Sequence, residues 1–395
     1  MADSTTPVIV AACRTPVGKY LGALSSLTAP QLGALAVREA VKRAGVDAAS
    51  VDEVILGHVI QGGTGQAPAR QALIHGGIPG TVPALTINKV CGSGLKAVML
   101  AAQAIKAGDA QCIIAGGMEA MSAAPHYVYG YRGGIKAGDQ TMVDGMIRDG
   151  LWDSFGNNHM GEYAEYTADK TGITRAEMDE FAAKSHQKAV AAQGAGKFDA
   201  EIFAVEIPGK NGPTVVKLDE GPRKDTSVEV LAKLKPSFRK DGRVTAGNAP
   251  GLNDGSSALV VTSAAFAKAH GLKVLAKVTG YATGGGEPKD LFFAPIQAVQ
   301  NLMQKAGRKI GDYGLIEANE AFAVQAIADG RGLKWDWDRV NVNGGAIALG
   351  HPIGASGARV LTTLLYAMAD RKVATGLATL CLGGGNAVAL SVEIA

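Results

Sequence analysis

Cys91 lies where a short apolar run, ALTINKV at 84–90, meets the glycine-rich start of a helical pattern. A thiol at that junction faces unpaired backbone N–H groups and the positive end of a helix dipole, and both favour the thiolate. The thiolate is the nucleophilic form of cysteine, and the nearby glycines leave room for N–H donors to an oxyanion. Cys91 is therefore a candidate nucleophile, although a lone free cysteine is more commonly a small buried apolar side chain.

Three further polar residues occupy similar positions. His351 stands in GGAIALGHPIGASG, where it can act as a base, as a neutral hydrogen-bond donor or simply as a turn residue. Asn319 follows a short apolar strand in LIEANEAFA, and it faces a cleft, caps the next helix or does both. Cys381 precedes Leu382 and three glycines, whose backbone N–H groups can converge on an anion.

Two cysteines, a histidine and an asparagine on glycine-rich turns together fit acyl-thioester chemistry. In such a site one thiol accepts an acyl group, two sets of donors hold an oxyanion and an enolate oxygen, and a second base moves protons. Cys13 and Cys112 lie inside apolar runs and are expected to be structural. No cysteine or histidine pair has zinc-site spacing, so we expect no structural metal.

The composition limits the class of protein that carries these residues. The chain has 395 residues, a net charge of +3, 47% hydrophobic residues and 53 glycines. The balanced charge gives no reason to expect a nucleic-acid or anionic-membrane partner, and no apolar run is long enough to span a membrane. The N-terminus lacks the pattern of a secretory signal, so we expect a cytoplasmic protein.

Strand-like and helix-like segments alternate at both ends of the chain. The run 84–90 is followed by a helical pattern from Gly94 to Gly108 and by a strand at 112–116. Near the C-terminus, NVNGGAIALGHPIGASGARVLTTLLYAM leads in the same way into TGLATLCLGGG. This order predicts an α/β fold with a mostly parallel sheet, built from a duplicated unit. Residues 121–247 are more charged and predict a large insertion.

Six motifs resemble those of the thiolases, specifically the bacterial acetyl-CoA C-acetyltransferase type: NKVCGSGLKAV, AGGMEAMS, TAGNAPGLNDG, EANEAFA, NVNGGAIALGHPIGASGAR and CLGGGNAVAL. They occur in the family's order, and the match runs over essentially the whole chain. The resemblance implies a duplicated five-layered α-β-α-β-α core with an inserted loop domain. It implies an N-terminal half of residues 1–120 and 248–272, a loop domain of 121–247 and a C-terminal half of 273–395.

The resemblance also implies a reaction. Two acetyl-CoA molecules would condense reversibly into acetoacetyl-CoA and CoA, by a ping-pong Claisen reaction through an acetyl-cysteine on Cys91. Cys381 would remove the α-proton of the second acetyl-CoA. His351 would activate Cys91 and would then donate to the thioester oxygen, beside a water held by Asn319. The backbone N–H groups of Cys91 and Gly383 would form the other oxyanion hole.

CoA would lie under the loop domain. The matching positions are Leu151, His159, Met160, Arg223, Phe238, Ala246, Pro250 and Phe322. Arg223 suits a phosphate or an adenine edge by its charge and planarity, although it is otherwise explained as a solvated surface charge. The resemblance implies no prosthetic group, only CoA and acetyl-CoA as substrates. It implies self-association as a homodimer or a dimer of dimers, commonly a homotetramer.

Two departures from the family pattern bear on specificity. Pro250 replaces the family's serine, so a hydroxyl contact to the pantetheine is missing. Phe292 and Phe293 stand where relatives usually have small residues around a Met-Gly, and two rings near the acyl pocket would either narrow it or reshape its wall. The His-Met-Gly run at 159–161 favours the short-chain biosynthetic subtype, whereas the aromatic pair keeps a longer-chain degradative 3-ketoacyl-CoA thiolase as the alternative.

Two other classes fit less well. A condensing ketoacyl synthase would share the duplicated fold and the nucleophilic cysteine, but the Cys-Leu-Gly-Gly-Gly and Asn-Glu-Ala-Phe segments argue against it. A CoA-binding protein that has lost catalysis would lack a catalytic group, and this sequence lacks none of them.

Overall fold

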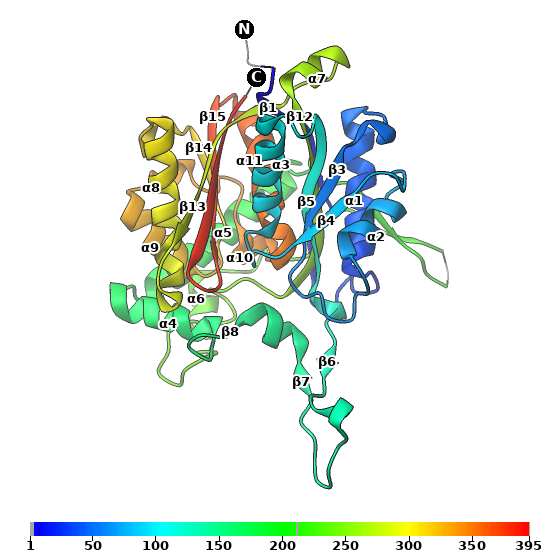
Figure 1. Cartoon of the computed structure of the whole chain (residues 1–395). Coiled ribbons are helices and arrows are strands. Elements are labelled where there is room, and N and C mark those ends of the chain that lie inside the picture. Colours follow the sequence, from blue (N-terminus) through cyan, green and yellow to red (C-terminus); the bar gives the residue numbers. More distant parts are fainter. Residues whose placement is uncertain (1–3, 211, 395) are drawn as a thin grey trace.

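The computed structural model describes residues 4–210 and 212–394, and its frame is a pair of mixed sheets (Figure 1). Strand pairing runs through both without a break, so they are the two halves of one hydrogen-bonded sheet. The half called the first sheet has the order β4-β3-β5-β12-β1, and the half called the second sheet has the order β13-β16-β15-β14. The strands of the first are β1 (Pro7–Arg14), β3 (Glu53–Gly57), β4 (Ala84–Ile87), β5 (Cys112–Ala120) and β12 (Asn253–Ser263). Those of the second are β13 (Ala276–Gly285), β14 (Leu315–Ala318), β15 (Thr375–Leu382) and β16 (Asn386–Ile394).

The strand directions repeat as well. β3 is parallel to β4 and β5, and β14 is parallel to β15. A parallel bridge between Ile316 and Val340 takes the place of the β3–β4 pairing in the second sheet. In both sheets one strand, β12 or β16, is antiparallel to its two neighbours. Because most of the strand pairings are antiparallel, the expectation of a mostly parallel sheet is wrong. The sheets meet where β1 and β13 pair over two residues, so the predicted duplication is confirmed.

Helices complete the layers on both sides of each sheet and between them (Figure 1). α3 (Ser93–Ala107) and α11 (Ile353–Arg371) pack against each other in the middle. α1 (Ala29–Ala44) and α2 (Pro68–His75) cover the first sheet, while α8 (Ala294–Ala306) covers the second, beside α9 (Ala323–Leu333). Every residue from Ile353 to Leu365 is buried, because this part of α11 has protein on all sides. The five-layered fold predicted from the resemblance is confirmed.

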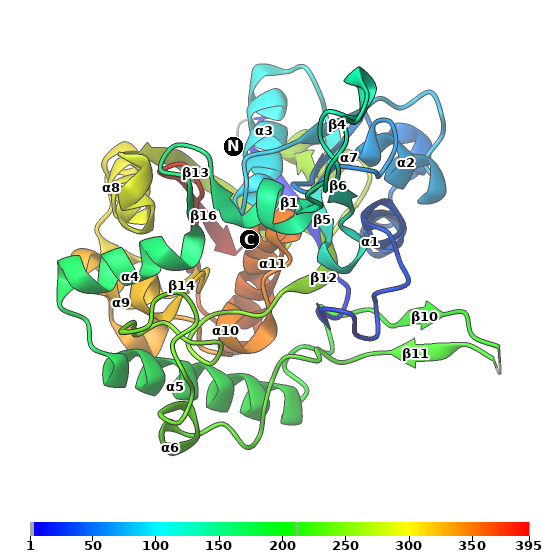
Figure 2. The same ribbon diagram turned by 90° about the horizontal axis from the view of Figure 1, so that it is seen from below.

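Between β5 and β12 the chain forms no strand of either main sheet within its described residues. The helices of this stretch are α4 (Met160–Thr171), α5 (Arg175–Gly194) and α6 (Val228–Leu231). Its short strands pair as hairpins: β6 (His126–Tyr127) with β7 (Val143–Asp144), β8 (Trp152–Asp153) with β9 (Asn158–His159), and β10 (Val205–Ile207) with β11 (Thr214–Val216). Seen from below, α4 and α5 pack on α9, and α5 also packs on α10 (Ala346–Leu349) (Figure 2).

The remaining elements are short. β2 (Gly18–Lys19) pairs with β12. The short helix α7 (Ala264–Ala269) follows β12 in the chain. Single 3-10 turns span Ala48–Ser50, Met121–Ala123, Tyr131–Gly133, Ile310–Asp312 and Trp337–Arg339, and a longer, kinked 3-10 segment spans Pro288–Phe293. A π-helical turn spans Ile147–Leu151. No helix in the described part of the chain combines the length and the apolar character needed to cross a membrane.

Candidate active site

Cys91 sits on a tight turn between β4 and α3. β4 ends at Ile87, earlier than the sequence predicted, because the Asn88 side chain accepts a hydrogen bond from the Val90 N–H (3.0 Å) and bends the backbone. Val90 has a left-handed φ of 46°, which is strained for a β-branched residue. The buried Ser93 hydroxyl closes the turn by donating to the Val90 carbonyl (2.6 Å). This turn presents Cys91 to the cavity described below.

The electrostatics of Cys91 differ from the prediction based on the helix terminus alone. Burial raises the pKa of Cys91 to about 12, and the nearby Glu119 carboxylate adds to the rise. The backbone N–H groups of Cys91 and Gly383 point at the sulfur and lower its pKa, but burial outweighs them. The resting group is therefore a thiol, and a base has to take its proton before it can attack.

His351 lies on the turn between α10 and α11, where its hydrogen bonds define its tautomer. Its backbone N–H donates to Asn253 Oδ1 (2.8 Å), which fixes the turn. Its Nδ1 lies 2.6 Å from Ser356 Oγ, and Ser356 donates to the Pro352 carbonyl (2.9 Å). Because the hydroxyl has one proton, Nδ1 must be the donor to Ser356, and the lone pair of the neutral ring is on Nε2.

The ring of His351 is held neutral by its surroundings. Burial lowers the pKa of His351 to about 3, and the positive charge of Arg359 contributes to the shift. A neutral imidazole with its lone pair on Nε2 is the form that can accept the proton of a thiol.

Asn319 follows the end of β14, and its backbone N–H donates to the Thr379 carbonyl of β15 (3.0 Å). Its Nδ2 lies 3.4 Å from His351 Nε2. The alternative interpretation of Asn319 as a helix cap is wrong, since the residue that precedes α9 is Phe322. Asn319 Oδ1 is buried and has no hydrogen-bond partner within the described chain, so it can accept one from a bound molecule.

Cys381 lies near the end of β15, beside the hairpin that joins β15 to β16. Gly384 and Gly385 form this turn with backbone φ angles of +78° and +81°, which residues other than glycine rarely adopt. Burial raises the pKa of Cys381 well above its usual value, and Cys91 and the buried Asp329 raise it further. Cys381 is therefore also a thiol at rest, within electrostatic reach of Cys91.

One cavity of about 290 Å³ collects these groups. Cys91, His351, Cys381 and Gly383 line it, whereas Asn319 does not line it and lies beside the His351 ring. Six of the eight positions expected to hold CoA line the same cavity, namely Leu151, His159, Met160, Phe238, Pro250 and Phe322. The structure thus brings residues from both halves and from the intervening stretch to one place.

Aromatic rings form one wall of this cavity. The His159 ring stacks on Phe238 (4.8 Å between centroids), and Phe322 meets both Phe238 (6.4 Å) and Phe292 (5.3 Å) edge to face. Phe292 lines the cavity, but Phe293 does not, and Lys170 Nζ lies 5.0 Å from the centre of the Phe293 ring. The expectation that both rings narrow the pocket is therefore corrected to Phe292 alone.

The other two expected CoA positions, Arg223 and Ala246, line an adjoining cavity of about 300 Å³. Ala249, Gly251 and Leu252 border both cavities. Lys19 and His186 also line the second cavity. Burial lowers the pKa of His186 to about 4, and the positive charges of Arg223 and Lys19 contribute to the shift. Neither cationic side chain has an ion-pair partner within the described chain, so this cavity offers two free positive charges.

Sequence reasoning missed several residues of this site. Ser356, Asn253 and Lys19 received no role, and the π-helical turn Ile147–Leu151, three of whose residues line the cavity, was not foreseen. The signal for Ser356 was its place in the first turn of the helix after His351. Within residues 4–210 and 212–394, no group of three or more His, Cys, Asp or Glu side chains is arranged to hold a metal ion.

Comparisons with known proteins all point to one family. Residues 7–265 match the thiolase N-terminal domain and residues 272–394 match the thiolase C-terminal domain. The chain is 56% identical to an acetyl-CoA acetyltransferase of Pseudomonas aeruginosa and 54% identical to one of Cupriavidus necator, over 98% of this chain in both. These alignments cover 98% and 99% of the relatives. The crystal structure of the Bacillus anthracis acetyl-CoA acetyltransferase superposes with a TM-score of 0.97 at 42% identity, over 99% of both chains.

Proposed function

The chain belongs to the thiolase family, and we propose that it is an acetyl-CoA C-acetyltransferase, an acyltransferase that reversibly condenses two acetyl-CoA molecules into acetoacetyl-CoA and CoA. One observation carries the proposal. Two thiols and a neutral histidine line a single cavity, and two backbone N–H groups point at one of the sulfurs. That set contains a nucleophile, a base, a second acid/base and an oxyanion hole.

In the first half-reaction, Cys91 accepts the acetyl group. The lone pair on His351 Nε2 takes the Cys91 proton, and the sulfur attacks the thioester carbonyl of acetyl-CoA. The oxygen of the tetrahedral intermediate then accepts hydrogen bonds from the N–H groups of Cys91 and Gly383. Collapse of the intermediate breaks the bond to the CoA sulfur and leaves an acetyl-Cys91 thioester.

In the second half-reaction, Cys381 removes the α-proton of another acetyl-CoA. A thiol cannot act as a base, so Cys381 must first lose its own proton. The CoA thiolate released in the first half is a base formed at that moment and can take it. The enolate oxygen is held by the protonated His351 Nε2 and by a water bound to Asn319. The carbanion attacks acetyl-Cys91, and the departing Cys91 sulfur recovers its proton from His351.

The two adjoining cavities suit the two ends of CoA. The apolar and aromatic wall formed by Leu151, Met160, Phe238 and Phe322 fits the pantetheine arm. Arg223 and Lys19 supply positive charge for the phosphates of the nucleotide end, near Ala246. Pro250 lines the first cavity and offers no hydroxyl or N–H to the pantetheine.

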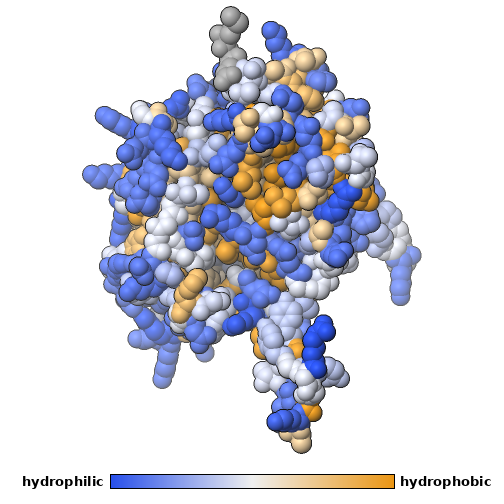
Figure 3. Space-filling view, in the orientation of Figure 1, coloured by the Kyte–Doolittle hydropathy of each residue, from blue (hydrophilic) through white to orange (hydrophobic). Residues whose placement is uncertain are grey.

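The division of the chain and its assembly belong to the same proposal. Residues 121–247 would cover CoA, between halves formed by 1–120 with 248–272 and by 273–395. Self-association as a homodimer or dimer of dimers is supported by the uncovered edge strand β4, where Leu85 is exposed. It is also supported by apolar residues over α3 and β4 and by the protruding β6–β7 segment (Figure 3). The four free cysteines suit a cytoplasmic location.

A longer-chain 3-ketoacyl-CoA thiolase is the alternative, and the Phe292 and Phe322 rings favour the short acyl group. Thiolysis of acetoacetyl-CoA and of 3-ketooctanoyl-CoA, each with free CoA, separates the two. We expect a much larger kcat/KM for acetoacetyl-CoA. An equal or larger value for the eight-carbon substrate would contradict the assignment.

A further inference from the structure

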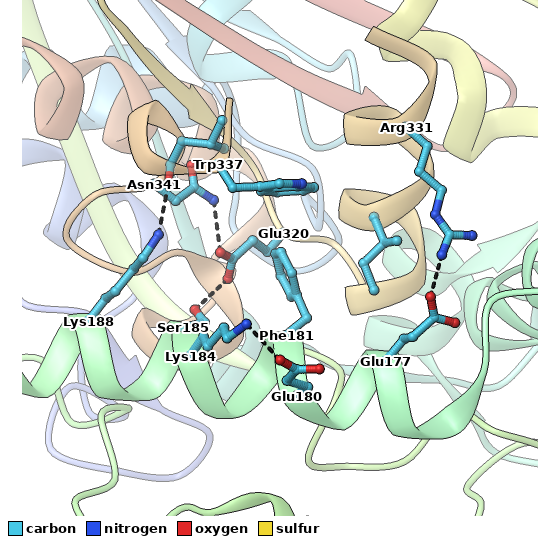
Figure 4. A pocket seen from close by; sticks show the side chains of 12 residues that line it. Glu177, Glu180, Phe181, Lys184, Ser185, Lys188, Glu320, Arg331, Trp337 and Asn341 are labelled. Carbon is cyan, nitrogen blue, oxygen red and sulfur yellow. Dashed lines mark hydrogen bonds and ion pairs between the residues drawn. The ribbon is translucent and has the colours of Figure 1, made fainter. Parts of the chain in front are cut away.

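Glu320 is a buried carboxylate that the proposed reaction does not use. It adjoins Asn319, is 1% exposed and accepts three hydrogen bonds. The donors are Ser185 Oγ (2.7 Å), Asn341 Nδ2 (2.8 Å) and the Ile347 backbone N–H (3.1 Å). Figure 4 shows the carboxylate between Ser185 and Asn341, in a groove bordered by α5 and α9.

The donors come from the segments that carry the candidate active site. Ser185 belongs to α5, and Asn341 and Ile347 belong to the stretch that leads through α10 to His351. Asn341 also binds both backbone groups of Ala318, accepting from its N–H (2.8 Å) and donating to its carbonyl (2.8 Å). The carboxylate and this amide therefore join the strand end that bears Asn319 to the segment that ends at His351.

The local backbone is shaped to admit the carboxylate. A Cβ atom on Gly345 would lie 2.2 Å from Glu320 Cδ, so any larger residue would displace the side chain. Ser185 Oγ in turn accepts from the Gly345 N–H (3.1 Å), which closes the network. All three partners of Glu320 thus act as donors, which is the arrangement that satisfies an ionised carboxylate.

We propose that Glu320 is a positioning residue, which fixes the 3.4 Å separation between Asn319 Nδ2 and His351 Nε2 by tying β14 to the segment before His351. This inference rests on the proposed function, in which those two residues hold the enolate oxygen. Through its hydrogen bond with Ser185, Glu320 also contacts α5. The stretch that would cover CoA is therefore tied to the same carboxylate as the oxyanion hole.

Glu320→Gln is the sharpest probe of this role because it keeps the shape and removes the charge. The new amide NH2 must face either Asn341 or the pair Ser185 and Ile347, all of which present donors. Asn341 cannot reverse its amide without losing the hydrogen bond from the Ala318 N–H. The substitution therefore breaks the network at one side or the other.

The test is a double-mutant cycle with Asn319→Ala, scored by kcat for acetoacetyl-CoA synthesis. We expect E320Q to lower kcat about 10- to 100-fold in the wild-type background, the size typical of a misplaced catalytic group, with little change in KM. In the N319A background the same change should have a clearly smaller effect, because one of the two groups whose separation Glu320 fixes is absent. Equal losses in both backgrounds would overturn the proposal, as would an unchanged kcat in folded E320Q.

Two further variants make the result unambiguous. Glu180→Gln makes the same chemical change at an exposed glutamate of the same groove and should leave kcat unchanged. Ser185→Ala removes only one of the donors to Glu320, so we expect a smaller loss of kcat than in E320Q. This loss of kcat must also shrink in the N319A background. If E320Q does not fold, the same cycle with Ser185→Ala tests the proposal. Failure of the proposed function is visible separately, since wild-type protein would then form no acetoacetyl-CoA.

Discussion

The Nδ1 atom of His351 lies 2.6 Å from the Ser356 hydroxyl, and this contact determines which nitrogen of the ring carries the proton. The Ser356 hydroxyl donates its one hydrogen bond to the Pro352 carbonyl, so it can only accept a hydrogen bond from His351. Ser356 therefore sets the tautomer of His351, the base that activates Cys91, although Ser356 itself does not line the cavity. Both thiols of the site have raised pKa values, which makes that base essential.

Replacing Ser356 by alanine should free His351 to adopt the other tautomer and to rotate. We expect kcat to fall at least about 10- to 100-fold, because a catalytic group that is slightly misplaced loses activity on that scale. Steady-state kinetics of acetoacetyl-CoA thiolysis measure the effect. Thr362→Val is the matched control, because it removes a buried hydroxyl from the same helix, one that contacts Ser257 and not His351. If both variants lose the same activity, Ser356 acts only through stability.

The buried neutral His351 should make the fold sensitive to acid. In the unfolded chain a histidine takes up a proton below pH 6.5, whereas in the folded protein His351 stays neutral until about pH 3. The unfolded state binds more protons between these values, so the free energy of unfolding falls as the pH falls through that window. His351→Gln should flatten the decline, measured as the urea midpoint against pH. An identical slope in both proteins would show that His351 does not contribute.

Cys381→Ser should separate the two half-reactions. Acetylation of Cys91 should survive, since the CoA thiolate can leave as an anion. Condensation should slow by about 10²- to 10⁴-fold, because a hydroxyl is a far weaker proton carrier at neutral pH. Cys112→Ser, at a buried thiol outside the cavity, serves as the control. Full rates of both half-reactions in C381S would exclude Cys381 as the base.

Phe292 and Phe293 offer a paired test of acyl-chain length. Only Phe292 lines the cavity, so F292A should raise kcat/KM for 3-ketohexanoyl-CoA relative to acetoacetyl-CoA, whereas F293A should leave that ratio unchanged. Because Phe292 is fully buried, its truncation is expected to cost about 3–5 kcal/mol of stability, and Phe292→Leu provides a milder version. A ratio that shifts equally in F292A and F293A would contradict the assignment of Phe292 to the acyl pocket.

Much of the fold could be predicted because its signals are local in the sequence. The strand before Cys91, the helix that ends at Gly108 and the matching segments near Cys381 are short patterns, and their repetition predicts the duplicated core. The resemblance of six motifs placed Cys91, His351, Asn319 and Cys381 in one reaction before any distance was known.

The remaining features depend on packing, which a sequence does not display. The helix terminus beside Cys91 predicted a favoured thiolate, but burial proved the larger effect. Asn253 supports His351 from far along the chain, and Lys19 joins Arg223 only when β2 pairs with β12. Phe292 and Phe293 are neighbours in sequence, yet they point to different environments. Such outcomes are determined by contacts between distant segments.

The central claim, that Cys91 carries the acetyl group, is tested most directly by mass spectrometry of the protein after brief exposure to acetyl-CoA and an acid quench. Trypsin separates the two candidate thiols, since Cys91 lies in the peptide 90–96 and Cys381 in the peptide 373–395. We predict an acetyl group on the first peptide, and its loss when free CoA is added before the quench. An acetyl group on the second peptide alone, or none on either while acetoacetyl-CoA accumulates, would contradict the account.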